Sequence, residues 1–296
     1  LFIFVAARLG YSACNVFYDS MLTDVTTDER MDMISSHGYA WGYIGSCLPF
    51  IAGIVVLFLT GMSAQGFRIS FLITAAWWLL LTIPLLKNVR QRHYLPGRPG
   101  TSRQIFRQVG ATFQKIRKNK RLLCYILGYF CYIDGVYTII SMATAYGNEL
   151  GIDTVQMILA LLLTQFVAFP CAILSGILAK KHGPLKLIKV FILAYIAICL
   201  FGYQLDKVWE FWVLAVAVGT CQGGIQALSR SYYGKLIPKE ESNEYFGFFD
   251  IFGKFADFIG PLIISFCALV LGSSTYGILA LVVLFVAGYL LVRKAE

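Results

Sequence analysis

Charged residues are scarce in this sequence, and their scarcity excludes a globule that is surrounded by water. Only 14% of the 296 residues are charged, 58% are hydrophobic, and the mean hydropathy is +0.70. A soluble domain carries about 25% charged residues, so lipid must be the solvent for much of this chain. The net charge of +9 does not indicate a nucleic-acid partner, because the charges cluster in short segments between long apolar runs.

Histidine is scarce as well, and the cysteines are unclustered. The three histidines lie at or near polar connections, and the eight cysteines all fall inside apolar runs without a CxxC pair or a metal-type pattern. We therefore expect free thiols, no metal and no cofactor. The sequence also lacks a P-loop, an HExxH motif and a GxSxG motif. We expect neither a nucleotide-driven pump nor a membrane enzyme, and no catalytic residue.

Long apolar runs are what the sequence has in abundance. A membrane span needs roughly 20 apolar residues, and the runs that qualify are 1–22, 34–60, 67–86, 122–148, 155–179, 185–205, 209–236, 245–271 and 275–292. They predict an all-α polytopic membrane bundle with about nine spans. Of the 25 Lys and Arg residues, 21 fall on one alternate set of connections and two on the opposite set. This bias predicts that the basic side is cytoplasmic.

The longest polar connection, 87–121, divides the chain. It contains the turn-rich segment 96–100 and then an apolar helical stripe that faces a basic one. The stripe consists of Ile105, Phe106, Val109, Phe113 and Ile116. We expect a cytoplasmic linker with a basic amphipathic helix on the inner membrane surface; a regulatory binding site is the alternative.

A faint internal echo relates two distant segments. The motif Tyr18-Asp19-Ser20 and its following polar turn reappear 211 residues later as Ser229-Arg230-Ser231 and a similar turn. A six-helix period follows, as in transporters built from two parallel halves. We therefore interpret 1–86 as the last three helices of a first half and 122–296 as a six-helix second half, and we expect three further spans ahead of residue 1.

Several motifs in this order resemble one known family. They include the segments 16–22, 35–45, 132–136, 222–231 and 247–255, which read VFYDSML, SSHGYAWGYIG, YIDGV, QGGIQALSRS and GFFDIFGKF. Together they resemble the vacuole-effluxer-like branch of the major facilitator superfamily, whose fungal, autophagy-related members are associated with amino-acid export from the vacuole. The resemblance implies twelve helices in two halves and alternating access.

This sequence departs at one position from the superfamily's cytoplasmic gating motif. Its second copy is similar to the segment 176–186, GILAKKHGPLK, and Lys180 occupies the position that is normally acidic. This copy cannot make the usual carboxylate contact. The change leaves open a sensor or scaffold that has a transporter fold but does not transport.

Ionisable groups inside spans are functional candidates, because a charge within the bilayer is costly. Asp134 lies about 18 Å into its span, near the midplane, with Tyr132 and Tyr137 close by. We expect it to bind a substrate ammonium or a coupling proton; a structural carboxylate is the alternative. Arg8 either faces the substrate or snorkels to the outer interface.

Three further sets of polar residues complete the candidates. Gln222 and Gln226, one turn apart, either line the pathway or join helices. Spacings of four and three place a gating or relay network on one helix face, and a static ion network is the alternative. The predicted network consists of Asp250, Lys254 and Asp257. Asp19 and Arg230, at equivalent positions of the echo, are expected to pair across the two halves when the inner gate closes.

These features favour a secondary transporter of small polar solutes, with amino acids and a coupling proton as expectations from the resemblance and from Asp134. Sugars, peptides or lipids are alternative substrates. The expected partners are a small molecule and the lipid bilayer, without nucleic acid, and the oligomeric state stays open. We expect a bacterial inner membrane, with a vacuolar membrane as the alternative.

Overall fold

The computed structural model describes residues 2–94, 102–149, 151–205 and 207–271, together with 275–296. The side chains of 102, 103, 105, 106, 257 and 271 lie outside this description. Within it, the chain is helical and contains no strand. The elements are α1 (Phe2–Ser20), α2 (Leu22–Val25), α3 (Met31–Leu59), α4 (Ala64–Asn88), α5 (Ser102–Lys118), α6 (Lys120–Glu149), α7 (Thr154–His182), α8 (Pro184–Tyr203), α9 (Val208–Leu236), the 3-10 turn η1 (Lys239–Glu241), α10 (Ser242–Leu271) and α11 (Thr275–Lys294).

Eight of the described helices are long and apolar enough to cross a membrane. They are α3, α4 and α6 to α11, so the prediction of an all-α membrane bundle is confirmed. The run predicted first, 1–22, forms the helix α1 but is not among the eight. Arg8, Asn15 and Asp19 dilute its apolar character.

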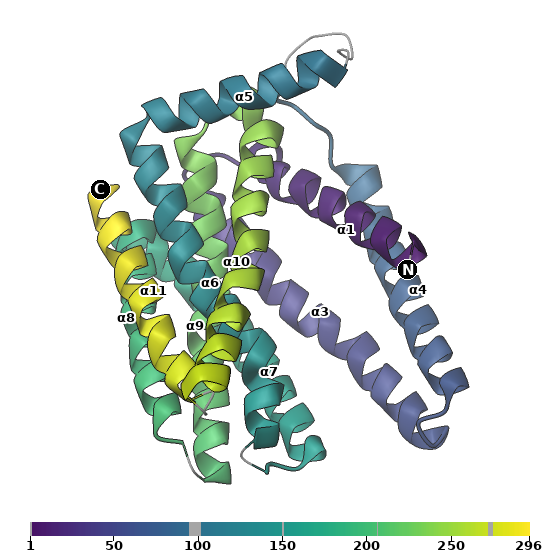
Figure 1. Ribbon diagram of the computed structural model, residues 1–296. Coiled ribbons are helices and arrows are strands. Elements are labelled where there is room, and N and C mark those ends of the chain that lie inside the picture. The colour runs from purple at the N-terminus through teal and green to yellow at the C-terminus, as the bar shows by residue number, and fades with distance from the viewer. Residues whose placement is uncertain (1, 95–101, 150, 206, 272–274) are drawn as a thin grey trace.

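The helices form two groups that are joined at one end (Figure 1). Helices α6 to α11 form a bundle, and the first half of α3 packs against α7 and α9 of this bundle. Helix α4 and the last part of α3 extend away from it (Figure 1). The first group, α1, α3 and α4, meets the bundle where α1 and α9 end and where α3 and α10 begin. Helix α5 lies across this joined end of the bundle (Figure 1).

Small residues allow the helices of the bundle to approach closely. A Cβ atom added to Gly288 of α11 would lie 2.9 Å from the Cβ of Tyr132 on α6, and one added to Gly128 would collide with Val292. The rings of Tyr195 and Phe285 stack beside this contact, 5.4 Å apart. Backbone proximity of this kind favours helix association in lipid, where burial of apolar surface supplies little drive.

Helices α1 and α4 leave most of their apolar surface uncovered. Phe2 and Ile3 are 90% and 88% exposed, and Gly66 is the one residue of α4 that is buried. Such surface suits contact with lipid or with other spans and would be a liability in water.

The helix boundaries repeat with the offset of the sequence echo. Helix α3 begins at Met31 and α10 begins 211 residues later, at Ser242; α4 begins at Ala64 and α11 begins at Thr275, again 211 residues later. The first group of helices therefore has a counterpart of matching register in α9, α10 and α11.

Candidate functional site

The joined end of the two helix groups is centred on Arg230 of α9. Its side chain is buried, and its Nη1 donates to the Oδ1 of Asp19 on α1 at 2.9 Å. Its Nε donates to the hydroxyl of Ser35 on α3 at 3.0 Å, and its Nη2 donates to the carbonyl of the same residue at 3.3 Å. One guanidinium group thus binds both α1 and α3.

Two tyrosines of the first group lie against the same guanidinium. The Cζ of Arg230 is 4.8 Å from the ring centre of Tyr39 and 5.5 Å from that of Tyr18, which are distances of cation–π contact. Gly38 leaves room for this arrangement, because an added Cβ there would lie 3.3 Å from the Nη2. The charge is therefore enclosed by hydrogen-bond acceptors and aromatic faces, the environment that a buried guanidinium needs.

A second ion pair joins the groups nearer to the surface. Lys239 of η1 lies 2.9 Å from the Oδ1 of Asp28, which precedes α3. Asp28 and Lys239 are 211 residues apart, as are Asp19 and Arg230. In an assembly with two-fold symmetry, a residue meets its own counterpart only on the axis. Both ion pairs therefore mark the pseudo-two-fold axis that relates the repeats.

Hydrogen bonds on either side of this axis repeat as symmetry mates. Ser20 donates to the side chain of Asn243, and Ser231 donates to Asp32. Each residue of the second bond lies 211 positions from its counterpart in the first, Ser231 from Ser20 and Asn243 from Asp32. Asp32 also accepts from Lys235 at 2.6 Å.

Asp134 lies inside the six-helix bundle, and its side chain is 1% exposed. Its Oδ1 accepts a hydrogen bond of 2.8 Å from the backbone N–H of Gly260 on α10. A side chain at residue 260 would collide with Thr138 and Asp134, and Pro261 follows directly. The carboxylate thus binds α10 at the point where proline interrupts the hydrogen-bond ladder of that helix.

The two predicted tyrosines near Asp134 differ in their surroundings. The hydroxyl of Tyr132 lies 2.6 Å from that of Ser229 and is fully buried, whereas Tyr137 is partly exposed. Tyr125, two turns before Tyr132 on α6, donates to the carbonyl of Ser229 at 2.9 Å. These tyrosines therefore brace the turn of α9 that precedes Arg230.

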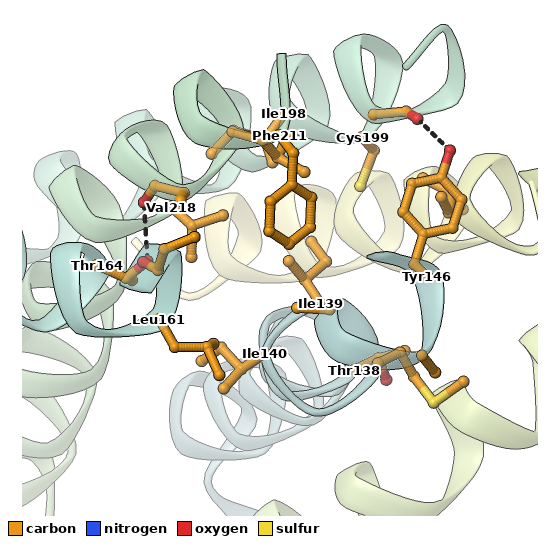
Figure 2. A pocket seen from close by; sticks show the side chains of 18 of the residues that line it. Thr138, Ile139, Ile140, Tyr146, Leu161, Thr164, Ile198, Cys199, Phe211 and Val218 are labelled. Atoms are coloured by element: carbon orange, nitrogen blue, oxygen red, sulfur yellow. Dashed lines mark hydrogen bonds between the residues drawn. The ribbon is translucent and has the colours of Figure 1, made fainter. Parts of the chain in front are cut away.

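The two predicted glutamines lie in different environments. Gln226 accepts a hydrogen bond of 3.3 Å from Tyr43 of α3, so it lies between the two helix groups. Gln222 is buried and lines a cavity of about 110 Å³ inside the six-helix bundle, together with Gln165. Ile139, Ile140 and other apolar side chains form most of its wall, as Figure 2 shows.

The other predicted residues do not all share one network among the described side chains. Lys254 donates to Asp250 one turn back on α10, while Asp257 lies outside the described side chains. Arg8 and Lys180 are exposed, and neither has an ion pair or hydrogen bond among the described residues. The structure thus brings Asp19 and Arg230 together but leaves Arg8 and Lys180 outside this group.

Sequence reasoning missed Ser35, Tyr39 and the Asp32–Lys235 pair. Ser35 lies within the motif SSHGYAWG that carries the resemblance, but a motif does not reveal which residue its side chains contact. The echo did contain a usable signal for Asp28 and Lys239, because both lie in the aligned polar turns.

Comparison with known proteins agrees with the resemblance of the motifs. The model of the family "Vacuole effluxer Atg22 like" matches residues 19–294. An uncharacterised MFS-type transporter of Bacillus subtilis, YxiO, is 44% identical over 97% of this chain and 69% of its own length. Autophagy-related protein 22 of Yarrowia lipolytica is 26% identical over 81% of this chain, which spans 47% of that protein's length.

Solved structures share the fold at low sequence identity. The fucose:proton symporter FucP of E. coli has a TM-score of 0.67 and 13% identity, over 95% of this chain and 73% of its own. A second FucP structure, described as in the outward conformation, has a TM-score of 0.67 and 14% identity. These relatives and structural neighbours are transporters and not enzymes.

Proposed function

Because the chain belongs to the vacuole effluxer Atg22-like family of MFS-type transporters, we propose that it moves small polar solutes across its membrane by alternating access. The observation that carries the proposal is the Asp19–Arg230 pair, which joins the two helix groups at one end while α3 diverges at the other (Figure 1). A carrier needs such a gate, which can close on one side while the other side is open.

The joined end is the cytoplasmic end in this proposal, because Lys and Arg concentrate in its connections. The divergent end then faces outward, as in the FucP structure whose description states that conformation. The membrane is a bacterial inner membrane in this proposal, since the relative of 44% identity is bacterial.

Amino acids are the proposed substrates, supported by the resemblance of the motifs to fungal effluxers associated with amino-acid export and by the charges of both signs in the helices. Asp134 is the proposed proton-coupling group. Its Oδ1 accepts a hydrogen bond from the N–H of Gly260 on α10, so protonation of the carboxylate weakens this bond between α6 and α10. A ligand that binds one protonation state preferentially would then shift the conformational equilibrium.

The test is uptake of a labelled amino-acid panel by the purified protein in proteoliposomes, with and without an imposed pH gradient. We expect saturable uptake that the gradient accelerates and that Asp134→Asn abolishes. Glu240→Gln, which neutralises an exposed carboxylate of η1, is the matched control and should leave uptake unchanged.

Each other result changes the proposal in a defined way. Saturable uptake that is indifferent to both the gradient and Asp134→Asn retains the carrier and makes Asp134 structural. If the folded protein takes up no amino acid, the substrate proposal is wrong, and sugars, peptides, lipids or a sensor role replace it.

A further inference from the structure

The bundle covers one side of the apolar stripe of helix α5 and leaves the adjoining side open. On the covered side, Thr112 and Ile116 are 1% and 2% exposed. On the open side, Val109 and Phe113 are 45% and 47% exposed. An amphipathic helix normally buries its apolar stripe, so this exposed part of the stripe has no cover within the described residues.

The position of Phe113 indicates where the open side points. Its ring lies 6.1 Å from that of Phe248, on the second turn of the spanning helix α10. Helix α5 itself lies across the end of the bundle (Figure 1). The exposed apolar side chains are therefore level with the ends of the spans, which is the depth of the interface between lipid tails and headgroups.

Basic side chains follow the open edge of this apolar strip. Arg117 lies one turn after Phe113, Arg107 and Lys118 lie farther around the helix, and Lys120 begins α6. All four are exposed, and none has an ion pair or hydrogen bond among the described residues. Unpaired cations beside an exposed apolar strip complement an anionic bilayer surface, where each basic residue contributes about 1 kcal/mol of attraction.

The covered side of α5 is clamped to the segment that closes the joined end. Lys115 donates to both carboxylate oxygens of Glu241, at 2.7 and 2.8 Å. Gln108 donates to Glu244 at 2.6 Å, and Thr112 donates to the same carboxylate. The hydrogen bonds to Glu241 raise the pKa of Lys115 above its ordinary value, so this part of the clamp stays charged at neutral pH.

The same short segment also contacts the first helix group. Within 239–244, Lys239 pairs with Asp28 and Asn243 accepts a hydrogen bond from Ser20, so both contact the first helix group. Glu241 and Glu244 of the same segment bind α5. A restraint on α5 is therefore transmitted to the segment 239–244, which holds the two helix groups together.

We propose that α5 binds the anionic surface of the bilayer through Val109, Phe113 and its free cations, and that this binding braces the joined end through Glu241 and Glu244. The occupant is a lipid surface that carries negative headgroups. The inference is independent of which solute is moved, since it concerns only the linker and the closed end.

The experiment measures hydrogen exchange of the α5 amides in nanodiscs of phosphatidylcholine alone and in nanodiscs that also contain phosphatidylglycerol. From the attraction of two basic residues, we expect exchange across 102–118 to slow at least ~tenfold with the anionic lipid. The amides of 239–244 should slow in parallel, because the clamp transmits the restraint.

Paired variants separate α5 from a general effect of charge. Arg117→Gln/Lys118→Gln should remove most of the lipid dependence in both segments. Lys181→Gln/Lys186→Gln removes two exposed cations from the connection between α7 and α8 and should leave it unchanged. Lys115→Gln removes the contact with Glu241 and leaves the bonds of Gln108 and Thr112 to Glu244, so it should keep the response of 102–118 and reduce that of 239–244.

Two results would overturn the inference. Equal exchange of α5 in both lipids would exclude an anionic bilayer as its partner and would favour an acidic protein segment instead. An equal loss of response in both double variants would show that lipid charge acts on the whole basic end and not through α5.

Discussion

Breaking the Asp19–Arg230 pair should open the joined end. In Arg230→Gln the carboxylate of Asp19 loses its cationic partner while its side chain stays only 23% exposed. Removing one partner of a buried pair costs about 3–5 kcal/mol, and the lower value applies because Asp19 retains some solvent. A cost of about 3 kcal/mol shifts an equilibrium roughly 150-fold, so an end that is closed in about 99% of molecules would be closed in about 40%.

A distance measurement across the joined end reports this shift. Spin labels at Arg30 and Lys181 suit it, because both residues are exposed and because Gly176 of α7 packs against Met33 and Ser36 of α3 nearby. The labels require a background in which the eight free cysteines are replaced. We expect one short distance in the parent protein and a second, longer distance in the variant.

A charge-swap variant and a control variant in a different ion pair complete the experiment. Asp19→Arg/Arg230→Asp should restore only part of the short-distance population, because the swapped arginine lacks the rings of Tyr18 and Tyr39 and the oxygens of Ser35. Lys189→Gln breaks a pair with Glu296 that does not join the two groups and should change nothing. An unchanged distance distribution in Arg230→Gln would refute the assigned role.

Two further predictions concern the same interfaces. Asp32→Asn should open the joined end less than Arg230→Gln does, because the amide still accepts from Ser231 and only the charge of Lys235 loses its partner; the same distance measurement checks it. Gly288→Val should lower the melting temperature of the purified protein, since overpacking costs about 1–3 kcal/mol, whereas Gly42→Ala, with open space around it, should not.

Apolar length was enough to predict most of the helices. The run 34–60 corresponds to α3 and the run 245–271 to α10, because a span long enough for lipid leaves a continuous apolar signal. The run 1–22 was the exception. Its apolar residues form a helix, but its polar side chains at 8, 15 and 19 keep α1 outside the eight candidate spans.

The partners of polar side chains were harder to predict than the helices. Gln222 and Gln226 are one turn apart, yet one lines a cavity within the bundle and the other binds Tyr43 across the groups. The spacing of two residues on a helix gives the angle between their side chains, but it does not give the neighbour that each side chain contacts. Those neighbours depend on how the helices pack, and helix packing produces no periodic pattern in a single sequence.

The repeats have opposite charge at the joined end, and symmetry explains why. Asp19, Asp24 and Asp28 of the first repeat correspond to Arg230, Lys235 and Lys239 of the second, each 211 positions later. Equivalent residues near a two-fold axis face each other, so identical repeats would oppose like charges there. Substituting acids in one repeat and bases in the other converts that repulsion into attraction.

The third charge pair shows the limit of this symmetry. Asp24 accepts from the backbone N–H groups of Arg92 and His93, where the chain leaves α4, and its counterpart Lys235 pairs with Asp32 instead. Only residues on the axis meet their own counterparts, so this pair lies away from the axis. The carboxylate of Asp24 is therefore available to bind the linker, and both the Asp19–Arg230 contact and this attachment of the linker follow from the same inversion of charge.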